Sequence, residues 1–209
     1  MEKQNNHIDR RGFLKIVGIS AATTTAALYG CGSGTKSSQG RNASSPVPTD
    51  QMTYRSVGGI KDKVSLLGYG CMRWPTVPSP EGKGDLINQE AVNELVDYAI
   101  AHGVNYFDTS PVYVQGWSEK ATGIALKRHP REKLYIATKL SNFSNFSREN
   151  SLAMYHQSFK DMQVEYFDYY LLHAMDKTKF EKADRIGAWD FLFKMKAQGK
   201  IKHCGFSFH

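Results

Sequence analysis

Residues 103–111 read Gly-Val-Asn-Tyr-Phe-Asp-Thr-Ser-Pro, and this stretch decides the fold of the chain. A helical pattern ends at Gly103, a short apolar run follows, and the run finishes on the carboxylate of Asp108. Tyr113 comes just beyond, in the turn that follows. In parallel α/β enzymes, the chemistry is carried by strand ends and by the loops that follow them. We therefore take Asp108 and Tyr113 as candidate site residues.

The rest of the chain alternates strands and helices. An opening hairpin is predicted over 52–60 and 61–70, and a loop rich in proline and glycine runs to about Leu86. Helices are predicted to begin after Asn88, at Ser118 and after Ser147, and another covers 186–199. Strands are predicted at 104–107, 134–137, 167–172 and 200–208. Such alternation is typical of parallel βα units.

Two parallel architectures fit this alternation, an open doubly wound sheet and a (β/α)8 TIM barrel. The doubly wound dinucleotide fold requires Gly-x-Gly-x-x-Gly, and residues 68–73, Gly-Tyr-Gly-Cys-Met-Arg, lack its last glycine. Ionisable residues recur at successive strand ends, namely Asp108, Lys139 and His173, which is where barrel enzymes keep their active sites. We therefore predict a barrel. A complete barrel takes about 250 residues, so we expect only about its first five strands here, and a C-terminally incomplete chain.

Composition limits the function classes. The chain has 209 residues with a formal charge of +7. Residues 1–50 contribute six basic and three acidic side chains, so 51–209 carry 21 basic and 17 acidic ones, a net charge of +4. A surface so mixed predicts no nucleic-acid partner. Three cysteines without a Cys-x-x-Cys pair indicate neither a metal site nor a disulfide framework.

The first 31 residues resemble a twin-arginine export signal. Arg10 and Arg11 precede Gly-Phe-Leu-Lys and a weakly apolar run. Residues 28–31, Leu-Tyr-Gly-Cys, resemble a lipoprotein processing box with Cys31 as the acylated residue; ordinary cleavage near Gly30 is the alternative. Residues 32–51 have the composition of a flexible linker. This pattern predicts a bacterial protein exported by the twin-arginine machinery, either periplasmic or held at the membrane through Cys31.

The strand-end residues suggest acid–base chemistry. Neighbouring strands lie about 4.8 Å apart, so Asp108 can pair with Lys139, and Tyr113 can reach the same lysine. An ordinary tyrosine has a pKa of about 10 and is a poor proton donor near neutral pH. A nearby ammonium stabilises the phenolate and makes the tyrosine a usable general acid. His173 could donate a hydrogen bond to a substrate carbonyl, on which negative charge grows during reduction.

Residues 52–209 resemble the aldo/keto reductase family through five local motifs. These are Leu-Gly-Tyr-Gly-Cys-Met at 67–72, Phe-Asp-Thr-Ser-Pro-Val-Tyr at 107–113, Ile-Ala-Thr-Lys at 136–139, Asp-Tyr-Tyr-Leu-Leu-His at 168–173 and Gly-Phe-Ser-Phe at 205–208. The resemblance implies a tetrad of Asp108, Tyr113, Lys139 and His173. It also implies that Ser207 and the first-strand residues Gly70, Cys71 and Met72 line the nicotinamide end of a cofactor site.

The implied reaction is reduction of an aldehyde or ketone, with NADP(H), or else NAD(H), as the hydride source and Tyr113 as the proton donor. The family commonly has asparagine where Phe208 follows Ser207 here. Its phosphate-binding residues lie mainly in the part of the barrel expected beyond this chain. Exported members with a similar last strand often carry a 4Fe–4S segment further on, which these residues cannot reveal. We expect no metal ligands within them.

Three alternatives stay open. The domain could be a cofactor-binding aldo/keto-reductase-like protein with little turnover, or an inactive fragment of a longer enzyme. An exported barrel hydrolase would need two carboxylates at strand ends, and only Asp108 is found there.

Overall fold

The structure is a computed structural model that describes residues 47–82, 84–143 and 145–208. Its central feature is a five-stranded parallel sheet with the order β3-β6-β7-β8-β9. The strands are β3 (Tyr69–Gly70), β6 (Tyr106–Asp108), β7 (Tyr135–Leu140), β8 (Phe167–Met175) and β9 (Ile201–Phe208). Because each neighbour in the sheet is also the next of these strands along the chain, the sheet winds in one direction. The predicted parallel βα alternation is confirmed.

Two of the helices that connect these strands begin after residues whose side chains accept from a backbone N–H of the first turn. Asn88 caps α2 by accepting from the Ala91 N–H, and Ser147 caps α4 by accepting from the Asn150 N–H. The helices are α2 (Gln89–Ala101), α3 (Ser118–Leu126), α4 (Arg148–Met162), α5 (Lys177–Arg185) and α6 (Ala188–Ala197). Short 3-10 turns form η1 (Cys71–Arg73), η2 (Tyr113–Gly116) and η3 (Arg131–Lys133).

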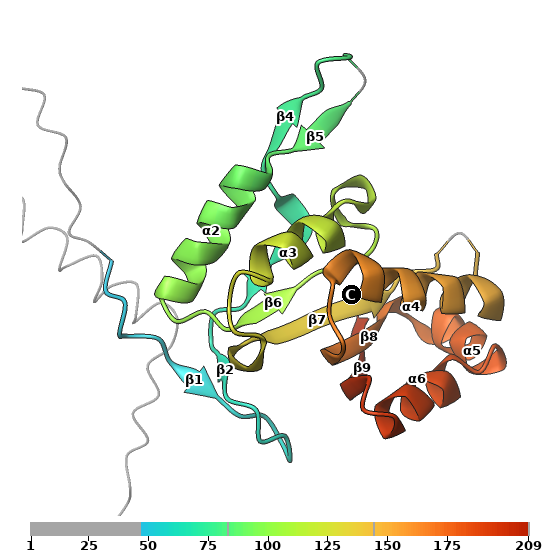
Figure 1. The fold of residues 1–209 in the computed structure, drawn as a ribbon. Helices are drawn as coiled ribbons and strands as arrows, with labels where there is room; N and C mark the ends of the chain where they lie inside the picture. Colours follow the sequence, from blue (N-terminus) through green and yellow to red (C-terminus); the bar gives the residue numbers. More distant parts are fainter. Residues whose placement is uncertain (1–46, 83, 144, 209) are drawn as a thin grey trace, which may run out of the picture. The chain divides into compact units, whose positions relative to one another are not determined.

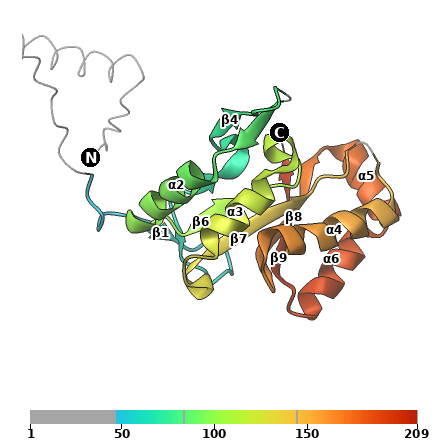
Figure 2. The same ribbon diagram turned by 45° about the horizontal axis from the view of Figure 1, so that its top comes forward.

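The two faces of the sheet have different neighbours. On one face, the ring of Tyr155 in α4 packs on Tyr170 of β8, and α2, α3 and α4 lie in a row (Figures 1 and 2). On the other face, the Tyr169 hydroxyl donates to Asp62 at 2.8 Å, and its ring stacks on His203 of β9. Asp62 lies in the loop between β1 (Tyr54–Arg55) and β2 (Val64–Ser65). A doubly wound sheet would carry helices on both faces, whereas these five parallel strands and the helices between them are consistent with part of a (β/α)8 barrel.

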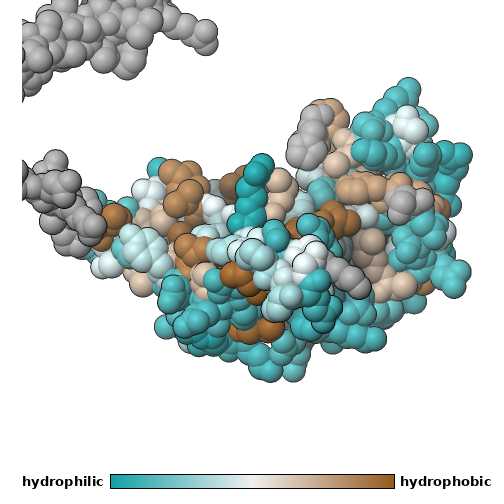
Figure 3. Space-filling view, turned by 90° about the horizontal axis from the view of Figure 1, so that it is seen from above, coloured by the Kyte–Doolittle hydropathy of each residue, from teal (hydrophilic) through white to brown (hydrophobic). Residues whose placement is uncertain are grey.

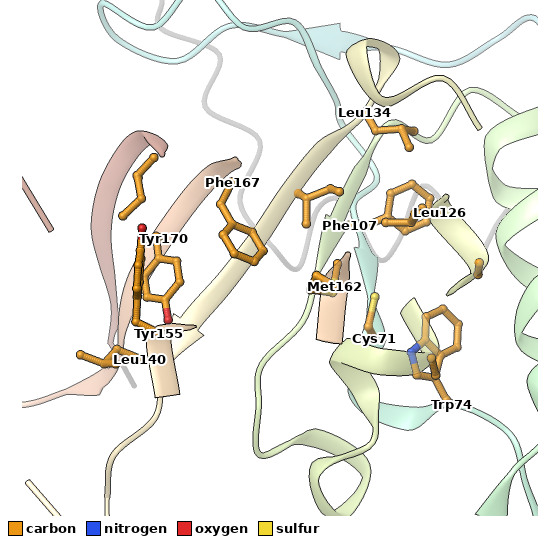
Figure 4. Packing of buried hydrophobic residues seen from close by; sticks show 14 of the residues in the cluster. Cys71, Trp74, Phe107, Leu126, Leu134, Leu140, Tyr155, Met162, Phe167 and Tyr170 are labelled. Carbon is orange, nitrogen blue, oxygen red and sulfur yellow. The ribbon is translucent and has the colours of Figure 1, made fainter. Parts of the chain in front are cut away.

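The core lies between the sheet and its helices. Figure 4 shows its aromatic and aliphatic side chains, among them Phe167 and Tyr170 near Tyr155. Gly123 lets α3 approach the end of α4, because a Cβ at this glycine would lie 2.6 Å from the Met162 carbonyl oxygen. No side chain fits in that space. Glycine is therefore required where these two helices meet.

Three predictions of detail are wrong. The strand expected over 61–70 is divided, because β2 ends at Ser65 and Tyr69–Gly70 joins the main sheet instead. The loop expected up to Leu86 contains a second hairpin, formed by β4 (Thr76–Pro78) and β5 (Asp85–Ile87). Helix α5 was not predicted.

The face seen in Figure 3 is largely hydrophilic, with hydrophobic residues in separate patches. Among the described residues, no helix has the length and apolar character that crossing a membrane would require. The predicted export signal over 1–31, its Cys31 and most of the predicted linker over 32–51 lie outside the described residues.

Candidate active site

Three successive strands bring Asp108, Lys139 and His173 to the same edge of the sheet. Asp108 is the last residue of β6, and it is in register with Ala137 of β7. Lys139 is in register with Leu171 of β8, two residues before His173. Because side chains alternate between the faces of a strand, Lys139 points away from the helices that cover Thr138 and Leu140. The parallel strands therefore bring these groups together at the carboxyl ends of the strands, which we call the mouth of the site.

Asp108 and Lys139 form an ion pair. The Lys139 ammonium hydrogen-bonds to the Asp108 carboxylate and also donates to the Thr109 carbonyl at 2.8 Å. The lysine side chain is 5% exposed, whereas the aspartate side chain keeps 31% of its surface. Burying an ammonium requires a partner charge and further hydrogen bonds. The pair therefore holds one cation in a fixed place at the mouth.

Tyr113 reaches this cation from the turn that follows β6. Its ring centre lies 4.8 Å from the Lys139 ammonium nitrogen, within the range of a cation–π contact. The turn is unusual, since Val114 and Gln115 both have positive φ, at 48° and 55°. Such backbone is unfavourable for side chains other than glycine and asparagine, and is often found at functional sites. The turn places Tyr113, half-buried, at the rim of the mouth.

His173 completes the group. It is 6% exposed, and its ring lies edge-on to Tyr113, with the ring centres 5.7 Å apart. The Phe143 ring lies 4.9 Å away. The structure thus brings together all four residues that the sequence predicted.

Two serines and this phenylalanine were not predicted as part of the site. The Ser141 hydroxyl lies 2.6 Å from the Nδ1 atom of His173, and the Ser110 hydroxyl lies 2.8 Å from that of Ser141. Both serines are buried. Ser110 follows Asp108 by two positions and Ser141 follows Lys139 by two positions, but this spacing alone does not show that the two hydroxyls meet at His173.

A buried carboxyl group lies on the helix side of β7, the strand that carries Lys139. Glu119 of α3 is 1% exposed and accepts a hydrogen bond from the Thr138 hydroxyl. Burial raises its pKa to about 7, against the lowering effect of that hydrogen bond and of the nearby Lys139 charge. Strand β7 thus carries Lys139 on the mouth side and contacts a titratable acid on its helix side.

The four predicted cofactor-binding residues have different surroundings. Gly70, at the end of β3 beside Asp108, has no heavy atom within 4 Å of the place of a Cβ, so its backbone borders open space. Met72 is 48% exposed. Cys71 is fully buried, which raises the pKa of its thiol to about 12, so only its backbone can face a ligand. The Ser207 hydroxyl accepts from the Ala174 N–H at 2.7 Å and retains its own proton for donation.

A nicotinamide fits these surroundings in its chemistry. Its flat ring needs an open backbone surface, as at Gly70, and its carboxamide oxygen needs a donor, as the Ser207 hydroxyl can be. In 47–82, 84–143 and 145–208, no group of three or more His, Cys, Asp or Glu side chains is arranged to hold a metal ion.

Comparison with known proteins finds similarity to one protein family. Residues 66–209 match the model of the aldo/keto reductase family. The chain is 32% identical over 153 residues to probable aldo-keto reductase 1 of Glycine max, covering 69% of this chain and 42% of that protein. It is also 32% identical over 158 residues to L-galactose dehydrogenase of Arabidopsis thaliana, covering 72% and 47%.

Among solved structures, the fold is similar to a holo-form aldo-keto reductase from Bacillus halodurans. The TM-score is 0.60 at 26% identity, and the match covers 75% of this chain and 50% of that one. The chain therefore spans about half the length of the relatives that it matches.

Proposed function

The chain belongs to the aldo/keto reductase family, and from this membership we propose that it works in the NAD(P)H-dependent reduction of an aldehyde or ketone to an alcohol. The observation that carries the proposal is the Asp108–Lys139 ion pair with Tyr113 and His173 beside it. The cofactor proposed is NADP(H), with NAD(H) as the alternative.

Four residues would contact the cofactor, and none of them would transfer the hydride. When bound, the reduced nicotinamide supplies the hydride for the carbonyl carbon. Ser207 would donate to its carboxamide, and the backbone of Gly70 and Cys71 with the Met72 side chain would border its ring. The protein contributes orientation and electrostatics at this end of the site.

The proton comes from Tyr113 in this proposal. As the carbonyl carbon gains a hydride, negative charge develops on the oxygen and the tyrosine hydroxyl protonates it. The Lys139 ammonium then stabilises the phenolate that remains, because it is a fixed positive charge against the tyrosine ring. Asp108 keeps the ammonium in position. His173 donates a hydrogen bond to the same carbonyl oxygen and helps to disperse its charge.

Replacing Tyr113 by phenylalanine tests the proposal. The change removes one oxygen and leaves the ring that contacts Lys139 and His173, so cofactor binding should persist. We expect carbonyl reduction to fall by about 100-fold or more, the usual worth of a general acid. Loss of nicotinamide absorbance measures turnover, and quenching of protein fluorescence measures cofactor binding.

The matched control is Tyr98→Phe, at an exposed tyrosine on α2. Turnover that survives Tyr113→Phe unchanged would refute the assignment. A wild-type protein that binds the cofactor and reduces no carbonyl compound would instead support a binding protein without turnover.

We also propose that the protein is exported through the twin-arginine machinery. The proposal rests on Arg10, Arg11 and the Phe-Leu-Lys that follows one residue later. Replacing both arginines by lysine should leave the protein in the cytoplasm, and fractionation of bacterial cells would measure this. Labelling with a radioactive fatty acid, with Cys31→Ser as control, would test the membrane tether.

A further inference from the structure

The proposed role of His173 depends on where its proton lies. A neutral imidazole carries one proton, on either Nδ1 or Nε2, and only the protonated nitrogen donates. If the neutral ring donates from Nε2 to a substrate oxygen, Nδ1 is unprotonated and can only accept a hydrogen bond. The group that contacts Nδ1 therefore decides whether the ring can act as proposed.

Two hydroxyl groups lie next to Nδ1. Ser141 Oγ is 2.6 Å from it and Ser110 Oγ is 3.4 Å from it, and the two hydroxyl oxygens are 2.8 Å apart. The serines come from the loops after β6 and at the end of β7, so they join the ends of the two strands that carry Asp108 and Lys139. Ser110 is 0% exposed and Ser141 is 3% exposed. Water has little access to compete with this chain of hydroxyls.

The backbone favours one direction for the chain of hydroxyls. The N–H of Val112 points to Ser110 Oγ at 3.4 Å, and an amide N–H can only donate. Ser110 accepts from this N–H and can donate its own proton to Ser141, and Ser141 can then donate its proton to Nδ1. The competing acceptor for Ser141 is the Lys139 carbonyl oxygen at 3.4 Å, a much longer contact than the 2.6 Å to the imidazole.

We propose that Ser110 and Ser141 are positioning residues that form a hydroxyl relay, which keeps Nδ1 of His173 as an acceptor and the ring proton on Nε2. This inference rests on the proposed function for its purpose, although the relay itself is a property of the folded protein. The rings of Tyr113 and Phe143 fix the plane of the imidazole, at 81° and 51° to it. The relay fixes its tautomer.

The first experiment measures the tautomer directly. The full chain is made with histidine labelled with the NMR-active nitrogen isotope, and the ring nitrogens are observed near neutral pH. The chain has seven histidines, and the signals that vanish in His173→Gln belong to this ring. We expect the Nδ1 signal at the position of an unprotonated nitrogen and the Nε2 signal at that of a protonated one. A proton on Nδ1 in the wild type would overturn the relay, with no variant needed.

The second experiment perturbs the relay. In Ser141→Ala we expect a mixture of tautomers, and in Ser141→Thr, which keeps a hydroxyl, a return to the wild-type signals. The control is Ser158→Ala, which removes another fully buried serine hydroxyl, on α4. Unchanged nitrogen signals in Ser141→Ala would refute the relay.

Kinetics then separates the relay from the proposed function. We expect Ser141→Ala to lower kcat for carbonyl reduction by about 10-fold, the lower end of the effect seen when a metal-binding histidine loses the partner that orients it. The affinity for the cofactor should not change, and Ser141→Thr should restore kcat. A protein with the proton on Nε2 and no turnover would refute the proposed function and leave the relay supported. An active protein with the proton on Nδ1 would refute the relay and leave the proposed function supported.

Discussion

Replacing Glu119 by glutamine should change how the stability of the protein depends on pH. Glu119 has an ordinary pKa of 4.5, and burial raises it to about 7 in the folded protein. Each pKa unit corresponds to about 1.4 kcal/mol, so ionised Glu119 is about 3 kcal/mol less favourable folded than unfolded. The side chain is 1% exposed, so solvent screening removes little of this difference.

The sign follows from proton binding. Between pH 4.5 and about 7, the folded protein keeps a proton on Glu119 that the unfolded chain has released. The free energy of unfolding contributed by this group is therefore largest below pH 4.5, falls as pH rises to about 7, and is constant above that. Glutamine resembles the protonated acid in shape, accepts from Thr138 in the same way, and does not titrate.

Urea unfolding of the wild type and of Glu119→Gln at several pH values measures the effect. The stability of the variant relative to the wild type should rise by about 3 kcal/mol between about pH 4 and about pH 8. Other titrating groups cancel in this difference. Glu94→Gln, at an exposed position on α2, is the matched control and should keep the wild-type profile. Parallel pH profiles for the wild type and Glu119→Gln would refute a buried acid with a raised pKa.

Three further changes test other parts of the structure. Gly123→Ala should lower the free energy of unfolding by about 1–3 kcal/mol, because the new methyl group meets the Met162 carbonyl; a thermal midpoint equal to that of the wild type would contradict the close approach. Lys139→Met leaves Asp108 without its partner charge and should reduce turnover by about 100-fold or more, with cofactor binding, measured by fluorescence, largely kept. Asp62→Asn weakens the contacts between the first hairpin and the sheet, so amide hydrogens of β1 and β2 should exchange faster while those of β7 do not.

The strand–helix alternation was predictable because each unit has its own local signal. Val92 and Val96 mark the buried face of α2, and Asn88 marks its start. The place of the tetrad was predictable for a related reason, since parallel strands bring their carboxyl ends to one edge. Asp108 and Lys139 therefore needed only their strand ends to be located.

The elements that were not predicted, the β4–β5 hairpin and α5, lack such signals. The residues of β4 and β5 are exposed or half-buried, so no alternation of apolar and polar residues marks them as strands. In α5, Ala183 alone is buried, and the remaining residues read as a polar loop. The hairpin forms through backbone pairing, and α5 has an N-cap in Asp176, whose side chain accepts from the Lys179 N–H.

The serines of the site could not be read from the sequence for another reason. Ser110 and Ser141 are common polar residues in loops, and their meaning comes from a distance across two strands that no spacing in the sequence encodes. The sequence located the chemical groups. The hydrogen bonds that orient them appear only in three dimensions.

Alternate side chains of β7 face the site and the helices, and this arrangement limits how the strand can change in evolution. Lys139 faces the mouth, while Thr138 and Leu140 on either side of it face the helices. Inserting or deleting one residue within this strand would turn the ammonium into the core and a leucine toward the substrate, so both the fold and the chemistry would fail together. Natural variants should therefore change β7 by substitution alone, and length variation should gather instead in segments such as the exposed hairpin β4–β5.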